Sequence, residues 1–430
     1  MIPQLKSYLG HSYPAQLAEM VKKAWPRESL ARLPQEHHLR QLIDIAYHAS
    51  FLRDEDRQVR FRLIFGDPSF FPPEDGPPSG LMPLTLDPSR PFDEQEIRKL
   101  AMAALFFRSM IGVCPAADQN LHIWGVVVSG TRWLSSLAGG RYRGPLVPDS
   151  LILHSLGPGH LTTHLGARRI ATLSGGRIES QAFDLFHSRW LHQHFSEVRH
   201  NVLTDVFGQA SDVEKIPVDV DFVRMMSYNI LLRTLSVVRN GRHGGTLIIL
   251  DPRDEPQLTA TDKAIRFKYR IADCPARRRY DALLKSAVAR LSELSALQNN
   301  KKMGWTEYQN LSDGRLGDLD EALFDFAHFL ADLMAVDGAL VVTHGFRLVG
   351  FGAELRVDPP GFQQVRHGLD AEGQIWTNES IEGVGTRHRA VYRFCEGYPR
   401  ALGVVVSQDG SVQVVRKHHG RVTFWNQLSW

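Results

Sequence analysis

The stretch DLMAVDGALVVTHGFRLVGFGAEL, residues 332–355, contains the change of pattern that decides the fold of the C-terminal part of this chain. Upstream of it, apolar residues recur at helical spacing from Leu319 to Leu333, so we predict a helix that ends near Val336. The apolar run that follows has no helical period and predicts a strand, a turn and a second strand. We expect GFGAE, residues 350–354, to form a further turn.

The chain downstream of this stretch alternates between a helix and strands. GVGTRHRAVYRF, residues 383–394, predicts a turn that enters a helix, and ALGVVVS, residues 401–407, predicts an apolar strand. Two last strands are expected within residues 411–425. This order predicts a compact α/β domain with a mixed central sheet flanked by helices. We place its start in the polar stretch around residue 300, so that it spans residues 301–430.

Residues 1–300 have the pattern of an α+β region. Short runs split by glycines between His122 and Ile178 predict an antiparallel meander. The Pro- and Gly-rich stretch Gly66–Pro91 predicts a long loop and a sub-boundary near residues 66–120. The remaining expected elements are helices over 92–114, 182–206, 218–239 and 277–297, and strands over 246–250 and 264–271.

Composition excludes several classes of protein. The chain has 430 residues, of which 43% are hydrophobic and 23% charged, so wholesale disorder is excluded. Its net charge of +3 excludes a generally polybasic protein. The three cysteines are too far apart in sequence for a disulfide framework or a paired-cysteine zinc site. We find no signal peptide and no apolar run long enough to span a membrane, so we expect a cytoplasmic protein.

Two polar motifs stand at the ends of predicted elements. Asp337 precedes a strand and a flexible glycine, and its carboxylate suits a divalent cation. Arg387 and Arg389 can fork onto phosphate oxygens, and the helix that follows offers free N–H groups to the same anion. These residue types together suit the transfer of a nucleotidyl group. That reaction needs a divalent metal and cationic side chains that neutralise the negative charge of a triphosphate.

The two motifs, DGA at 337–339 and GTRHR at 385–389, resemble the signature motifs of diadenylate cyclase (DAC) domains. The resemblance covers residues 319–430, and it extends to VSQ at 406–408, which is similar to the DNA-integrity-scanning branch. It implies a nucleotidyltransferase that condenses two ATP molecules into the second messenger cyclic di-AMP and releases pyrophosphate. The implied cofactor is Mg²⁺ or Mn²⁺.

The resemblance also implies roles for individual residues. Asp337 would bind the metal and help to activate the 3′-hydroxyl, and Leu355 would lie along the adenine. Other branches carry Ser-Glu-Glu where this chain has Ser407, Gln408 and Asp409, so the role of a second metal carboxylate would fall to Asp409. The implied catalytic residues are Asp337, Gly338, Arg387, His388 and Arg389, and the implied nucleotide-binding residues are Ala339, Leu355, Gly385, Thr386, Ser407 and Gln408.

The resemblance implies partners as well. Each DAC domain binds one ATP, so two domains must meet face to face, and we expect self-association. LGPGHLTTHLGARRIATLSGGRI, residues 156–178, faintly resembles the sensor regions of some bacterial diadenylate cyclases. We therefore expect residues 1–300 to regulate the enzyme through an unknown ligand.

Two other functions stay open. A catalytically weak nucleotide-binding sensor would keep the pocket and lose turnover, and the missing glutamate at Gln408 favours it. A nucleic-acid-binding scaffold would use Lys263–Arg279, where seven Lys/Arg accompany one Asp. We expect that strand to be a solvated face or a contact with the cyclase domain, and nucleic acid is not an expected partner.

GRHGG, residues 241–245, lacks the spacing of a phosphate-binding loop and predicts a turn before a strand. We expect His187, His192, His194 and His200 to be surface or interface residues and not metal ligands.

Overall fold

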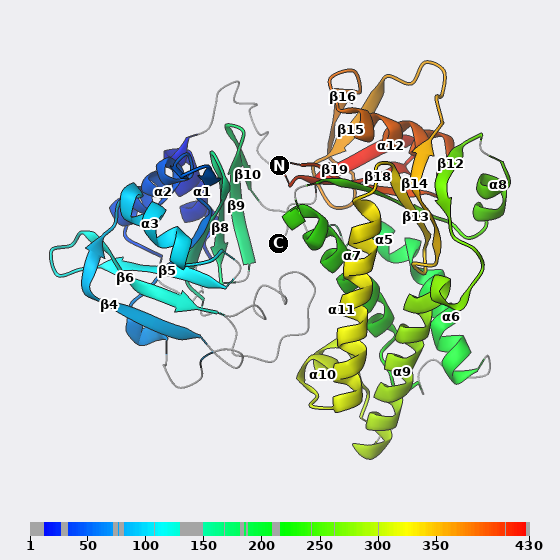
Figure 1. The fold of residues 1–430 in the computed structure, drawn as a ribbon, viewed down its shortest axis with the longest axis horizontal. Helices are drawn as coiled ribbons and strands as arrows, with labels where there is room; N and C mark the ends of the chain where they lie inside the picture. The colour runs from blue at the N-terminus through cyan, green and yellow to red at the C-terminus, as the bar shows by residue number, and fades with distance from the viewer. Residues whose placement is uncertain are drawn as a thin grey trace. The chain divides into compact units, whose positions relative to one another are not determined.

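The computed structural model contains two compact units, and the main division of the chain lies between residues 182 and 183 (Figure 1). It describes residues 13–26, 33–71, 76, 81–106, 108–129, 149–166, 168–180, 185, 188–208, 216–241, 243–261, 263–299, 301–408 and 410–426. Among the helices of these residues, none is long and apolar enough to cross a membrane.

The first unit is built on an eight-stranded sheet with the order β10-β9-β8-β7-β3-β5-β6-β4. Helices α1 (Pro14–Ala24) and α2 (Glu36–Ala49) bury their apolar side chains with those of the sheet in a single core. The antiparallel meander predicted from the glycine-split runs is present from β7 to β10. Its first expected strand, β6, pairs with β4 and β5 instead of β7. The strands are β3 (Phe61–Phe65), β4 (Met82–Pro91), β5 (Ser109–Pro115), β6 (Leu121–Val128), β7 (Leu151–Gly157), β8 (His160–Leu165), β9 (Arg168–Ser174) and β10 (Arg177–Ser180), and a two-stranded ribbon joins β1 (Arg53–Asp54) to β2 (Arg57–Gln58).

Three predictions in this unit are wrong. The helix expected over 92–114 is α3 (Glu94–Ala103) only, and the apolar residues after it form β5. A short apolar run does not distinguish a strand from a buried helix, and here pairing with β3 and β6 decides the outcome. The stretch expected to be a loop contains β4. Because β3 pairs with β5 across the intervening residues 66–108, no sub-boundary near 66–120 divides the unit.

The second unit is built on a nine-stranded sheet with the order β12-β14-β13-β11-β17-β18-β19-β15-β16. It is mixed, because β11 is parallel to β13 and β15 is parallel to β19, whereas the other pairs are antiparallel. The predicted α/β class with a mixed sheet flanked by helices is confirmed. The strands are β11 (Gly245–Leu250), β12 (Ile265–Arg270), β13 (Ala339–Thr343), β14 (Leu348–Leu355), β15 (Gln364–Gly368), β16 (Trp376–Ser380), β17 (Leu402–Val406), β18 (Val412–His418) and β19 (Arg421–Asn426).

The position of β11 corrects the predicted domain boundary at residue 300. All six residues of this strand are buried, and it lies between β13 and β17 at the centre of the sheet. The domain that carries both motifs therefore needs residues from well before 300 to complete its sheet. The polar stretch that we took for the boundary contains a helix, α10 (Trp305–Asn310).

Helices cover the central strands of this sheet (Figure 1). α12 (Thr386–Gly397) packs Val391 and Phe394 into a core with Ile248 of β11 and Val405 of β17. The long helices α7 (Val220–Gly241) and α11 (Gly314–Met334) pack against each other and contact the central strands. The other helices of the unit are α5 (Arg189–His194), α6 (Ser196–Phe207), α8 (Glu255–Ala260) and α9 (Arg279–Leu297), which the 3₁₀ turn η5 (Pro275–Arg278) precedes.

Candidate functional site

One edge of the nine-stranded sheet gathers the segments that the sequence singled out. Thr246 at the start of β11 pairs with Ala339 at the start of β13, and Gly245 pairs with Val406 at the end of β17. The Asp337-Gly338 pair and the Ser407-Gln408 pair therefore flank the start of β11 on its two sides. With neighbouring strands about 4.8 Å apart, their backbones are separated by about 10 Å.

Asp337 presents its carboxylate to solvent at this edge. The side chain is 90% exposed, and its Oδ2 lies 3.1 Å from Nζ of Lys268 on β12. The same ammonium donates to the Asp337 carbonyl oxygen at 3.0 Å. The cationic strand predicted over 264–271 is solvated, as expected, and it also contacts the first motif.

Gly338 has a backbone that a side chain would not tolerate. Its φ is +117°, and a Cβ there would lie 2.5 Å from the carbonyl carbon of Gly352. Gly352 itself has a φ of +59°. The expected turn at GFGAE is absent, because these residues belong to β14, where the two glycines allow β13 and β14 to approach closely. The glycine of the first motif is thus required by packing.

The second motif forms the N-terminus of α12. Gly385 is the extended residue before the helix, and Thr386 begins it. Arg387 donates from Nη1 to the carbonyl oxygen of His243 at 3.3 Å. A Cβ on Gly244 would lie 2.5 Å from this nitrogen and 2.8 Å from the carbonyl oxygen of Val406. A glycine at 244 therefore leaves the space that the guanidinium occupies.

His388 and Ser407 complete the contact between the helix and the end of β17. Nε2 of His388 lies 3.4 Å from Oγ of Ser407. A tight turn holds the serine, because the Ser407 N–H donates to Ser411 and the Gly410 N–H donates back to Ser407. The amide nitrogen of Gln408 lies near Gly244 in the same turn. Asp409 lies outside the described residues.

Arg389 is placed differently from Arg387. Residues two apart on a helix do not share a face. Arg389 donates to the carbonyl oxygen of Val384 at 3.1 Å and lines a pocket of about 390 Å³ between the loops at 358–363 and 381–382. Within one chain, Arg387 and Arg389 therefore do not converge on one phosphate group.

Leu355 lies at the end of β14, opposite Ile265 of β12, and is partly buried against the core of the unit. Because Ala353 pairs with Ala339, Leu355 lies at the same edge of the sheet as Asp337. This position is compatible with the predicted contact with a base beside the metal carboxylate.

The donors at this edge suit a metal that arrives with a nucleotide. The described residues contain no group of three potential protein ligands for a metal ion. Mg²⁺ usually binds proteins through one or two carboxylates together with phosphate oxygens and water, and Mn²⁺ accepts the same oxygen ligands. Asp337 can supply such a carboxylate, so the site fits a metal–triphosphate complex better than a metal held by protein alone.

The sequence analysis missed several residues of this edge. His243 and Gly244 were assigned only to a turn, and Lys268 only to a solvated strand. Arg239, near the end of α7, contacts the turn after Ser407, because a Cβ on Gly410 would lie 3.4 Å from its Cγ and Nε. Neither glycine spacing nor charge alternation reveals such contacts, since they depend on the pairing of β11 with β17.

Comparisons with known proteins address the first unit. Residues 28–128 match the family model of a probable sensor domain, DACNV. This is the N-terminal sensor domain typical of diadenylate cyclases. No curated protein and no solved structure matches the chain.

Proposed function

We propose that the second unit is a diadenylate cyclase that condenses two ATP molecules into cyclic di-AMP. The observation that carries this proposal is the shared sheet edge, where Asp337 and the cluster of Arg387, His388 and Ser407 flank the start of β11. An exposed carboxylate beside a cationic, hydroxyl-bearing cradle is the arrangement that a metal–triphosphate requires. The sensor-domain match in residues 28–128 supports the same function.

In this proposal the chain binds and orients the triphosphate. Arg387 and the free N–H groups at the start of α12 bind phosphate oxygens, and Ser407 adds a hydroxyl donor. Lys268, which pairs with Asp337 in the free protein, is available to a phosphate when the carboxylate binds the cation. Mg²⁺ or Mn²⁺ bound to Asp337 would neutralise part of the negative charge of the phosphates.

The reaction fixes the need for two subunits. In each half-reaction a 3′-oxygen forms a bond to an α-phosphorus, the bond from that phosphorus to the β-bridging oxygen breaks, and the 3′-hydroxyl proton and pyrophosphate leave. Both half-reactions require two ATP molecules in opposed orientation. We therefore propose that the protein self-associates so that two copies of this edge face each other. We also propose that the first unit regulates this encounter through an unknown ligand. The protein would act in the cytoplasm.

A direct assay tests the proposal. The full chain is incubated with ATP and Mn²⁺, and cyclic di-AMP and pyrophosphate are quantified by mass spectrometry and a coupled assay. We expect both products in a one-to-two ratio. In the Asp337→Asn variant we expect turnover to fall by about 10³-fold or more while ATP binding is largely retained, because the cradle for the phosphates is intact.

A nucleotide-binding sensor without turnover is the second candidate. The observation that favours it is Gln408, which stands where other branches carry a carboxylate, so that Asp337 is the single carboxylate of the two motifs within the described residues. Tight ATP binding by the wild type with no cyclic di-AMP at any Mn²⁺ concentration would establish this candidate and overturn the enzyme.

A further inference from the structure

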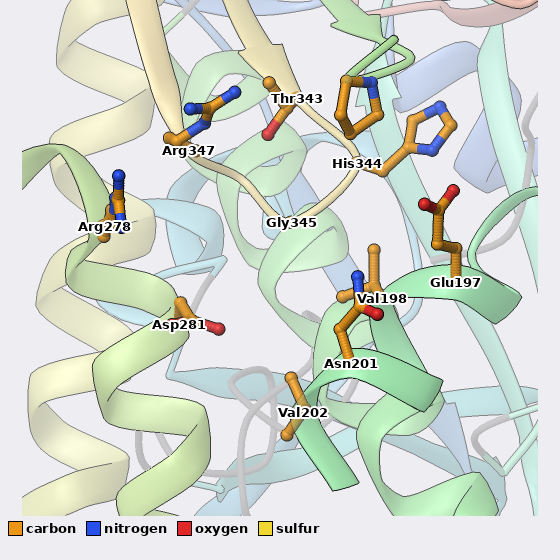
Figure 2. A pocket seen from close by; sticks show the side chains of 11 residues that line it. Glu197, Val198, Asn201, Val202, Arg278, Asp281, Thr343, His344, Gly345 and Arg347 are labelled. Atoms are coloured by element: carbon orange, nitrogen blue, oxygen red, sulfur yellow. The ribbon is translucent and has the colours of Figure 1, made fainter. Parts of the chain in front are cut away.

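A second pocket lies at the opposite end of β13 from Asp337 (Figure 2). It has a volume of about 190 Å³ and lies entirely within the second unit. Its walls come from α6, from the start of α9, and from the turn between β13 and β14 that contains His344 and Arg347. None of its residues belongs to the site described above.

His344 is a buried polar side chain of this pocket with unused hydrogen-bonding capacity. Only 4% of the residue is exposed, and neither ring nitrogen has a hydrogen-bond partner among the described residues. Burial lowers the pKa of His344 to about 4, so the ring is neutral at physiological pH and offers one donor and one acceptor. Buried polar groups are normally satisfied, so this histidine indicates a missing partner.

Two charged side chains on the rim form no ion pair in the described part of the chain. Glu197 and Arg278 line the pocket, and neither takes part in an ion pair there. Figure 2 shows Arg278 on one side of the pocket and Glu197 on the other. An opposite charge on each side suits a ligand that carries both an anionic and a cationic group.

The other charges around the pocket are already committed. Arg347 pairs with Glu255, Asp281 with Lys285 at 2.6 Å, and Arg253 with Asp251 at 2.5 Å. Glu197 interacts electrostatically with Arg253, but the guanidinium of Arg253 already donates hydrogen bonds to both carboxylate oxygens of Asp251. Glu197 and Arg278 are therefore the charges left to recognise a ligand.

The remaining lining and the size of the pocket narrow the class of ligand. Val198, Val202 and Pro252 provide an apolar wall between the charges. The volume corresponds to about six water molecules, which is the scale of a small amino acid. We propose that this pocket binds a small ω-amino acid, in which a short apolar chain separates the two charges, with its carboxylate at Arg278, its ammonium at Glu197 and a hydrogen bond to the imidazole of His344.

This assignment is independent of the proposed reaction, because it concerns binding only. The pocket nevertheless has a direct structural link to the first motif, since β13 runs from Ala339 beside Asp337 to Thr343 in the wall of the pocket. An occupant would contact the end of the strand whose other end presents the metal carboxylate.

Binding is tested on the full chain with a panel of ω-amino acids of increasing chain length, from β-alanine to 6-aminohexanoic acid, by thermal shift and then by isothermal titration calorimetry. We expect at least one amino acid to raise the melting temperature, and its deaminated acid and its decarboxylated amine to bind about tenfold or more weakly. Arg278→Gln and Glu197→Gln should each weaken binding by a similar factor. Both residues are exposed, so the variants should fold. Arg421→Gln, at an exposed position at the start of β19 in the same unit, is the matched control and should bind normally.

Three outcomes would overturn the proposal. The first is that no amino acid in the panel binds. The second is that the acid or the amine alone binds as tightly as the amino acid, which would remove the need for two charges. The third is that binding survives both Arg278→Gln and Glu197→Gln, which would place the ligand elsewhere on the chain.

Discussion

Arg387 donates a hydrogen bond to the backbone carbonyl of His243, which lies 144 residues earlier in the chain. This contact joins the first turn of α12 to the segment that enters the central strand β11. It places the cation of one motif at the sheet edge from which Asp337, in the other motif, also projects. The predictions below follow from this arrangement and from the packing that supports it.

Replacement of Arg387 by glutamine should weaken ATP binding and turnover together. The guanidinium lies beside Gly244, close to the backbone of Val406 and Gln408. Losing a charge-assisted bond to phosphate costs about 1.5–3 kcal/mol. We expect about 10- to 100-fold weaker ATP binding by calorimetry. Arg421→Gln serves as the control for loss of charge on this unit. Unchanged ATP affinity in Arg387→Gln would show that the phosphates bind elsewhere.

Gly338→Ala should destabilise the second unit and abolish activity. The added Cβ would lie 2.5 Å from the backbone of Gly352, and the residue has a φ of +117°. We expect a loss of about 2–4 kcal/mol in the free energy of unfolding, measured by urea titration. Gly383→Ala is the matched control, because a Cβ at that position meets nothing within 4 Å. Equal stability of the two variants would contradict the close approach of β13 and β14.

A fragment of residues 183–430 should fold, whereas residues 301–430 should not. The shorter fragment lacks β11, so β13 and β17 would lose their common partner at the centre of the sheet. It would also expose the apolar residues that β11 buries. Circular dichroism, proteolysis and gel filtration of the two fragments test this. A stable, monodisperse fragment 301–430 would restore the boundary expected from the sequence.

The second unit should become less stable as the pH falls from about 6.5 to about 4. Burial lowers the pKa of His344 to about 4, and burial also lowers that of the adjacent His194. Below about pH 6.5 the unfolded chain therefore binds protons that the folded chain excludes, and the folded state loses stability. Asp251 opposes this shift, whereas Arg253 and Arg416 reinforce it.

The contribution of His344 is measurable by substitution. The difference between 6.5 and about 4 corresponds to about 3 kcal/mol, so His344→Gln should flatten part of the pH dependence of urea unfolding. His194, whose ring centroid lies 4.1 Å from that of His344, should retain the rest. His200→Gln, on the exposed side of α6, is the control. An identical pH profile in His344→Gln and wild type would exclude this source of acid sensitivity.

Local pattern was sufficient for many elements of the fold. The stripe from Leu319 to Leu333 predicted α11, and the change of period at Asp337-Gly338-Ala339 predicted β13 and β14. These features depend on the spacing of neighbouring side chains, which the sequence contains directly. The apolar run that became β5 shows the limit of this reasoning, because its state depends on partners that are distant in the chain.

By itself, therefore, the sequence determined the two motifs, the α/β class of the unit that carries them and the residue types needed for a metal–triphosphate. The tertiary structure alone decided that β11 joins that unit and that His243 and Lys268 reach its motifs. It also decided that Arg387 and Arg389 lie on different faces of α12, and that a pocket exists around His344. The physical reason is that strand pairing and helix packing join residues far apart in sequence, and local periodicity does not specify which partner a buried strand will choose.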